Sequence, residues 1–420
     1  MIGVVYGTTG ELIKLAPVLT RLEERGMPAL TLCTGQQAEQ IPALLDDFGL
    51  MQPSVWLSRG SGGHDLERPA DLPRWCAGVT ATFSRRRREL RARWAASGAR
   101  PLLVVHGDTL TTVLGAAMGH VLRVPVAHIE AGMRSGNWRD PFPEELDRRV
   151  AARLARTHFA PDARAAANLR AMKVRGEIVD TGGNTIRDAI ELVPPGAIDM
   201  ELPRESFGLA SLHRFELLSS ARALNEILGL LREASRSAPI LFVDHPVTAA
   251  AVAAHDLDSL FDERFRRIPR QRYFDFIALL KASAFLVTDS GGSQQECAHL
   301  GHPCLVHRAV TEHSDGLGRS VVLSRMDADV ARAFLLEPLA YSSPPMVCEH
   351  APTDVIVEHL ERRGHLARVP AGLARRVNGS RFAMVSVPAR GREAVSSPSV
   401  RRGLGSSLAQ ASDQAVERDP

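Results

Sequence analysis

The sequence predicts an α/β fold made of two doubly wound parallel-sheet domains that face each other across a cleft. Short, continuous apolar runs alternate with longer amphipathic segments through both halves of the chain, which is typical of parallel strands covered by helices on both faces. The alternation restarts after a proline-containing segment at residues 192–207. A length of 420 residues is enough for two such domains.

Six strands are expected in the first half, where apolar runs end at polar or glycine residues. They are the segments 2–7, 29–35, 101–106, 124–129, 158–161 and 177–181. Helices are expected at residues 11–24 and 112–122, because Leu12, Leu15, Leu19 and Leu22 recur at helical spacing in the first of them. We assign residues 1–190 to the N-terminal domain.

The second half repeats this pattern. Strands are expected at residues 209–212, 240–244, 285–288 and 303–307, and helices at 217–234, 273–283 and 294–300. We assign residues 191–352 to a C-terminal, nucleotide-binding domain. A final helix at 353–364 is expected to pack back on the N-terminal domain. Residues 365–420, rich in Arg, Ser, Pro and Gly, predict a disordered tail.

Composition excludes several classes of protein. No stretch approaches 18 consecutive apolar residues, and the N-terminus has no basic region or cleavage site, so we expect neither a membrane span nor a secretory signal. The net charge of +3 comes from the region after residue 364, and the near-neutral remainder argues against nucleic-acid binding. The five cysteines lack metal-ligand spacing, which predicts free buried thiols and a cytoplasmic protein.

One segment has the pattern of a phosphate-binding turn. Ser290, Gly291 and Gly292 follow an expected strand and precede an expected helix, whose free N–H groups would favour an anion. Glu296 lies one turn into that helix, where its carboxylate can accept both hydroxyls of a ribose. The alternatives are glycines that only cap a turn and a solvated glutamate.

Three carboxylates follow strands or lie in loops of the first half: Asp108, Glu130 and Glu144. A doubly wound sheet brings such strand ends to one edge, where clustered carboxylates acquire the different pKa values that acid/base catalysis needs. The alternatives are that Asp108 caps the next helix and that Glu144 pairs with Arg148. His213 follows the first strand of the second half and can contact a diphosphate or pass a proton, whereas we interpret His106 and His128 as core histidines.

These segments, taken together, resemble a known family. The sequence contains H-G-D-T, H-I-E-A-G-M-R, P-F-P-E-E-L-D-R, G-N-T-I-R-D, H-R-F-E, D-S-G-G-S-Q-Q-E and T-E in this order. The set is similar to that of the non-hydrolysing UDP-N-acetylglucosamine 2-epimerases, which have the GT-B fold of two Rossmann-like domains. The resemblance covers about residues 1–363.

The resemblance implies an elimination of UDP across C1–C2, followed by re-addition with a proton delivered to the opposite face of C2. It implies that Asp108, Glu130 and Glu144 are the acid/base groups and that His213 acts near the phosphates. Lys14, Ser290, Gly291 and Gly292 would hold the diphosphate with His213, while Phe276 and Glu296 would hold uracil and ribose. Arg134 is a further substrate-binding candidate. The resemblance implies a UDP-sugar substrate and a homodimer, and neither a metal nor a nicotinamide.

The sequence departs from the family pattern where cationic residues are expected. Thr9 and His313 each stand in place of an arginine, and Phe215 and Leu217 replace polar groups. Two other activities therefore remain open. The protein could release UDP and free N-acetylhexosamine by hydrolysis, or it could bind a sugar nucleotide without turning it over.

Overall fold

The first half of the chain forms a parallel sheet of seven strands. The structure is a computed structural model, and it describes residues 1–66, 69–136, 143–195, 200–347 and 349–366. The strand order is β3-β2-β1-β4-β5-β6-β7, and every neighbouring pair is parallel. The strands are β1 (Ile2–Tyr6), β2 (Leu30–Cys33), β3 (Val55–Trp56), β4 (Leu102–His106), β5 (Val126–Ile129), β6 (Thr157–Ala160) and β7 (Glu177–Asp180).

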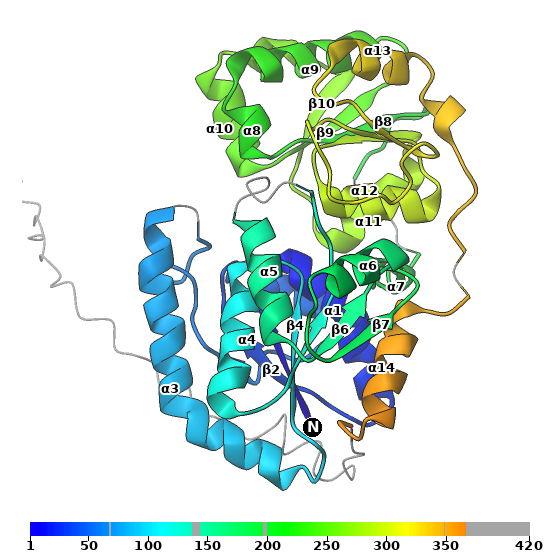
Figure 1. Ribbon diagram of the computed structural model, residues 1–420. Coiled ribbons are helices and arrows are strands. Elements are labelled where there is room, and N and C mark those ends of the chain that lie inside the picture. Colours follow the sequence, from blue (N-terminus) through cyan, green and yellow to red (C-terminus); the bar gives the residue numbers. More distant parts are fainter. Residues whose placement is uncertain (67–68, 137–142, 196–199, 348, 367–420) are drawn as a thin grey trace, which may run out of the picture. The chain divides into compact units, whose positions relative to one another are not determined.

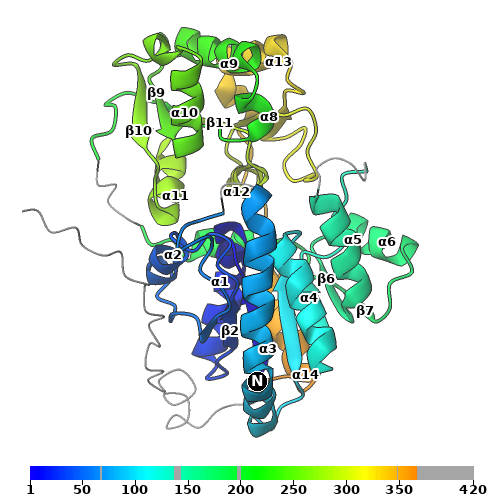
Figure 2. The ribbon, with the colours of Figure 1, turned by 90° about the vertical axis from the view of Figure 1, so that its left-hand side faces the viewer.

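Helices cover both faces of this sheet, and their apolar side chains form two cores. One core joins the sheet to α1 and α2, and the other joins it to α3 and α4, which lie side by side in Figure 2. The helices of this half are α1 (Thr9–Glu24), α2 (Ile41–Asp47), α3 (Leu72–Ala96), α4 (Leu110–Leu122), α5 (Glu144–Leu154), α6 (Ala163–Ala171) and α7 (Ile186–Glu191). A 3₁₀ turn, η1 (Pro69–Asp71), precedes α3.

The second half forms a parallel sheet of six strands in the order β10-β9-β8-β11-β12-β13. The strands are β8 (Gly208–Ser211), β9 (Ile240–Asp244), β10 (Phe265–Pro269), β11 (Phe285–Thr288), β12 (Cys304–Val306) and β13 (Val321–Leu323). The prediction of two doubly wound parallel sheets is therefore confirmed. The edge strands β3 and β13 were not predicted, because a strand of two or three residues shows no usable pattern. The edge strand β10 was not predicted either, because its five residues include two arginines and do not form an apolar run.

Helices were found in all three predicted segments of the second half, and α10 and α13 were not predicted. The helices of this half are α8 (Phe215–Leu218), α9 (Ala221–Ala234), α10 (Pro246–Ala254), α11 (Tyr273–Ala282), α12 (Gly291–Leu300) and α13 (Ala328–Leu336), with 3₁₀ turns η2 (Asp258–Leu260) and η3 (Pro338–Tyr341). The single helix expected at residues 217–234 was wrong. Ser220 accepts a hydrogen bond from the backbone N–H of Ala223, so its hydroxyl starts a new helix and separates α8 from α9.

Each sheet reverses its winding direction at one point, and the predicted site segments lie in the loops beside these two points. The first sheet reverses between β1 and β4, and the second between β8 and β11. In open α/β sheets, ligands bind beyond the carboxyl ends of the strands at such reversals. The loops after β1 and β4 carry the turns at residues 7–8 and 107–109, and those after β8 and β11 carry His213 and Ser290.

Helix α14 (Pro352–Arg362) follows the second sheet in sequence but lies against the first, as Figure 1 shows. Its residues Ile356, Val357 and Leu360 are buried in the same core as Leu15 and Leu19 of α1. At the surface, Arg21 of α1 contacts Asp354. The domain limits that we assign from the sequence stay a prediction, and residues 367–420 of the predicted tail lie outside the described residues.

Other expectations can be checked within the described residues. Cys33, Cys297 and Cys304 are free and buried as predicted. Cys76 is also free, but the prediction of full burial was wrong, because it lies on α3 at the edge of the core and is half-buried. Cys348 lies outside the described residues. No helix in the described part of the chain has the length and apolar character needed to cross a membrane.

The packing of α14 on α1 predicts a stability change for Ile356→Ala. Ile356 is fully buried, so the truncation should lower the free energy of unfolding by about 2–5 kcal/mol. The exposed Glu358 on the same helix is the matched control, and Glu358→Ala should change stability by less than about 0.5 kcal/mol. Chemical denaturation measures both, and equal effects would contradict this packing.

Candidate active site

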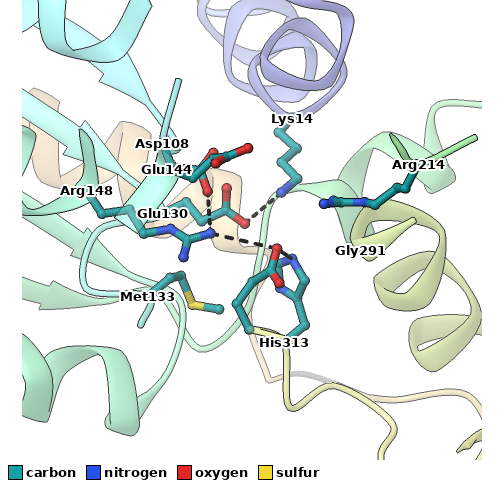
Figure 3. Close-up of a pocket in the computed structure, with 11 residues that line it drawn as sticks. Lys14, Asp108, Glu130, Met133, Glu144, Arg148, Arg214, Gly291 and His313 are labelled. Atoms are coloured by element: carbon teal, nitrogen blue, oxygen red, sulfur yellow. Dashed lines mark hydrogen bonds and ion pairs between the residues drawn. The ribbon is translucent and has the colours of Figure 1, made fainter. Parts of the chain in front are cut away.

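A cavity of about 140 Å³ lies where the two sheets' loops meet, and Figure 3 shows the residues around it. It brings together all three predicted carboxylates. Residues from both halves line it: Lys14, Gly107, Asp108, Glu130, Met133, Glu144, Arg148, Arg214, Gly291, Glu312 and His313. Five charged side chains of the first half and three charged or titratable ones of the second therefore face one small space.

Glu130 is the most constrained of the carboxylates. It follows β5 with a φ of 63°, a left-handed conformation that is uncommon for a residue with a side chain and is often found at functional sites. Its Oε1 accepts hydrogen bonds from Lys14 Nζ at 2.6 Å and from Asn184 Nδ2. Burial raises the pKa of Glu130, but the charge and hydrogen bond of Lys14, together with His106 and His313, outweigh burial and hold the pKa well below its usual range. Glu130 is therefore a buried, ionised carboxylate.

His106 faces the same carboxylate from the end of β4. Its Nε2 lies 3.8 Å from Oε2 of Glu130 and has no hydrogen-bond partner among the described residues. His106 and His128 are both buried, so the interpretation as core histidines is confirmed. Their ring nitrogens are not all satisfied, because His106 Nε2 and His128 Nδ1 have no hydrogen-bond partner in the described part of the chain. Burial lowers the pKa of His106 to about 4, so the ring is neutral at pH 7. His128 instead bonds the Gly107 carbonyl oxygen at 2.7 Å through Nε2.

Asp108 contacts an arginine that links the two halves, and Glu144 lies near Asp108 in Figure 3. Arg148 Nη2 contacts Asp108 Oδ2 and lies 3.7 Å from Glu312 Oε1. The capping alternative for Asp108 was wrong, because Thr109 caps α4 by accepting a hydrogen bond from Thr112. Glu144 Oε2 is buried and accepts no hydrogen bond in the described part of the chain, so it is not the group that binds Arg148.

A larger cavity of about 590 Å³ adjoins this group of residues and contains most of the predicted nucleotide contacts. Lys14 lines both cavities. The other predicted residues on the wall of the larger cavity are His213, Phe276, Ser290, Gly292 and Glu296. Gly291 lines the smaller cavity. All of the predicted diphosphate, uracil and ribose residues therefore lie around two neighbouring spaces.

The loop that carries His213 is fastened to the start of the phosphate-binding turn. Asp289 accepts hydrogen bonds from the backbone N–H groups of His213 and Arg214, at 2.9 Å and 2.8 Å. The next residue, Ser290, caps α12, whose N-terminal N–H groups offer a positive end to an anion. A Cβ at Gly291 would approach the His313 ring to 2.8 Å, so only glycine fits there beside this histidine.

Thr9 and His313, which stand in place of the expected arginines, both contact neighbouring side chains. The backbone N–H and hydroxyl of Thr9 both donate to Gln37 Oε1, at 2.7 Å and 2.8 Å. His313 is buried with its Nε2 3.7 Å from Glu312 Oε1. Arg214 lines the smaller cavity and supplies a cation from the second half.

Arg134 is the one predicted site residue that lines neither of these cavities. Its Nε lies 3.5 Å from Glu145 Oε1, and its Nη1 donates to the Met133 carbonyl oxygen. Glu145 also lies 3.4 Å from Arg148. Arg134 is thus connected to the carboxylate cluster through a buried glutamate.

Sequence reasoning missed five residues of this arrangement: His106, Arg148, Asn184, Arg214 and Glu312. Each lies in one of the motifs given above, but the sequence predicted chemical roles for other residues of those motifs. Within the described residues, no group of three or more His, Cys, Asp or Glu side chains is placed to hold a metal ion.

Comparison with known proteins identifies the family of this chain. The family model for UDP-N-acetylglucosamine 2-epimerase matches residues 92–333. A probable UDP-N-acetylglucosamine 2-epimerase of Ralstonia solanacearum is 30% identical over 362 residues, which cover 81% of this chain and 92% of the relative. The UDP-N-acetylglucosamine 2-epimerase of Bacillus subtilis is 30% identical over 324 residues, covering 74% and 80%. The chain belongs to this family.

Solved structures of the epimerase family have the same fold. The crystal structure of Methanocaldococcus jannaschii UDP-GlcNAc 2-epimerase in complex with UDP-GlcNAc and UDP matches with a TM-score of 0.69 and 25% identity, over 86% of this chain and 99% of that one. A co-structure of S. aureus MnaA with UDP matches with a TM-score of 0.69 and 23% identity, over 88% and 98%. The predicted GT-B fold and the family resemblance are both confirmed.

The burial of Glu296 predicts how stability depends on pH. Burial raises the pKa of Glu296 from 4.5 to about 7, so between these values the folded protein keeps a proton that the unfolded chain releases. The stability linked to this proton is complete below about pH 4.5 and is lost as the pH rises through 7. Glu296→Gln should remove about 2–3 kcal/mol of this decline. Urea denaturation of both proteins at pH 5 and pH 8 measures this decline in the free energy of unfolding. An equal decline in the two proteins would contradict the raised pKa of Glu296.

Proposed function

We propose that this protein interconverts a UDP-N-acetylhexosamine and its C2 epimer, of the UDP-GlcNAc to UDP-ManNAc type, by eliminating and re-adding UDP. The observation that carries the proposal is the single small cavity with three carboxylates, next to a helix N-terminus suited to a diphosphate. Membership of the epimerase family supports it, as do the relatives named UDP-N-acetylglucosamine 2-epimerase. The protein is accordingly an isomerase.

The chemistry explains why several carboxylates are needed. The C2–H bond has no adjacent carbonyl, so its proton leaves only as the C1–O bond to UDP breaks. The electron pair of C2–H then forms the C1–C2 double bond of a 2-acetamidoglucal. Re-addition of UDP to C1 with a proton delivered to the other face of C2 gives the epimer. One base and one acid on opposite faces of the sugar are required, and each typically contributes about 10²–10⁴ in rate.

We assign Asp108, Glu130 and Glu144 to these proton transfers. Glu130 suits a base, because it is ionised and has one oxygen without a protein donor. Glu144 also has an oxygen without a donor, while Asp108 is held by Arg148. Arg134 contacts Glu145, which in turn contacts Arg148, so Arg134 supports the arginine that holds Asp108.

The departing UDP must be held so that it can return. We assign Lys14, His213, Ser290, Gly291 and Gly292 to the diphosphate, since the cations and the α12 N-terminus face the two joined cavities. Phe276 and Glu296 line the larger cavity and suit uracil and ribose. Lys14 and Arg214 supply cations at the smaller cavity although Thr9 stands in place of an arginine, so loss of UDP by hydrolysis is not favoured.

Proton NMR in D₂O with UDP-N-acetylglucosamine tests the function. Loss of the C2 proton signal, with growth of a manno anomeric signal, is the expected result. Free UDP with free sugar would instead mean hydrolysis, and binding of UDP without exchange at C2 would mean a binding protein. Either of these two results overturns the proposed epimerisation.

Glu130→Gln separates catalysis from binding. The amide keeps the shape of the side chain but does not accept a proton, so turnover should fall on the order of 10³-fold. Binding of UDP, followed by calorimetry, should remain within about threefold, since the α12 N-terminus is unchanged. Thr20→Ser, in α1 and away from both cavities, is the control for handling and folding. Full activity in the Gln variant would contradict the assignment.

We also propose that the protein is a cytoplasmic homodimer that binds no nucleic acid. The free thiols of Cys33, Cys297 and Cys304 support a reducing compartment. Light scattering of the purified protein measures the oligomeric state directly.

A further inference from the structure

The two oxygens of the Glu130 carboxylate have different surroundings. Oε1 accepts hydrogen bonds from Lys14 Nζ and from Asn184 Nδ2. Oε2 lies 3.8 Å from the neutral His106 ring and accepts no hydrogen bond from any residue that the structure describes. One end of the carboxylate is therefore anchored and the other is left free toward the cavity.

Asn184 is itself held in one orientation. Its Oδ1 accepts a hydrogen bond from the backbone N–H of Ile186 at 3.0 Å, at the start of α7. Because a backbone N–H can only donate, the amide oxygen must face it, and the NH₂ group must face Glu130. The side chain is only 9% exposed, so water does not compete freely for these bonds.

Lys14 does not hold Glu130 as firmly on its own. It lines both cavities, and in the proposed function its ammonium also contacts the diphosphate. A lysine is a mobile point charge that rotates among acceptors, whereas a fixed amide donor keeps its direction. When the substrate binds and Lys14 shares its protons with phosphate oxygens, Asn184 is the donor that still orients Glu130.

We propose that Asn184 is a positioning residue for the epimerisation, which fixes Oε1 of Glu130 so that the C2 proton is transferred at Oε2. This inference rests on the proposed function, in which Glu130 is an acid/base group. In the elimination direction, the C2 proton goes to Oε2, its electron pair forms the C1–C2 double bond, and UDP leaves with the C1–O pair. A second effect follows, because a donor to a carboxylate stabilises its charged form and lowers its pKa.

Two variants and one control test this role. Asn184→Ala removes the donor and the contact with Ile186. Asn184→Asp keeps the shape and the acceptor for the Ile186 N–H, but places an acceptor against Oε1. Asn168→Ala is the matched control, because Asn168 is a half-buried asparagine of the same domain that donates to the Gly132 carbonyl oxygen at 3.0 Å, outside both cavities. Each protein is assayed for kcat, KM, UDP binding and the pH profile of kcat/KM.

We expect kcat to fall about 10- to 100-fold in Asn184→Ala and further in Asn184→Asp, with KM and UDP binding within about threefold of the unmodified protein. The pKa of Glu130 lies well below its usual range, so the acid limb of kcat/KM should stay in place and the loss should fall on kcat. A general loss of structure would also weaken UDP binding. Asn168→Ala should keep kcat, KM and UDP binding.

The outcomes separate this inference from the proposed function. If the unmodified protein does not exchange the C2 proton in D₂O, the proposed function is overturned. If it does exchange, while Asn184→Asp retains kcat, the positioning role is overturned. If Asn184→Ala fails to fold, as circular dichroism would show, Asn184→Asp carries the decision alone.

Discussion

The buried ion pair between Lys14 and Glu130 is the interaction on which the rest of the site depends. Removing two charges from water is costly unless each finds a partner, and breaking such a pair leaves an uncompensated charge. Lys14 lies on the first helix of the chain, whereas Glu130 ends the fifth strand. Their contact at 2.6 Å therefore requires β1 and β5 to occupy their places in one parallel sheet. The fold is what makes this ion pair possible.

The same pair explains how binding and proton transfer share one site. Lys14 borders both the small, carboxylate-lined cavity and the larger cavity beside the α12 N-terminus. An ammonium at that junction neutralises Glu130 on one side and attracts a diphosphate on the other. The left-handed backbone of Glu130 is consistent with this role, since strain of that kind persists only where surrounding contacts impose it.

The two halves of the chain are also joined by polar contacts close to the site. Arg148 lies between Asp108 of the first half and Glu312 of the second, and Arg272 contacts Asp47 at the edge of the larger cavity. Phe48 adds an edge-to-face contact with Phe274, whose ring centroid is 4.9 Å away. Contacts of this kind limit the entry of water. Water must be kept from a glucal intermediate if UDP is to return to C1.

The divergence at Thr9 and His313 acquires a physical meaning in this setting. Thr9 donates both of its hydrogen bonds to Gln37 and, unlike an arginine, has no charge to offer a phosphate. His313 is packed on Gly291 beside a glutamate, and a side chain at position 291 would collide with its ring. Arg214 is the arginine of the second half that lines the smaller cavity. The family chemistry is retained with a different distribution of positive charge.

The sequence by itself determined the alternation of strands and helices, the two doubly wound sheets, the family and the members of the carboxylate set. These properties depend on local patterns, because apolar periodicity and strand-end motifs involve residues close together in the chain. The short edge strands and the break at Ser220 were not predicted, because two or three residues show no periodicity. Only the tertiary structure decided that Arg148 binds Asp108, that His106 faces Glu130, and that Asn184 shares Oε1 with Lys14. These contacts join residues 24 to 116 positions apart, and hydrogen-bond geometry across such a separation is set by how the strands and helices pack, which no local pattern records.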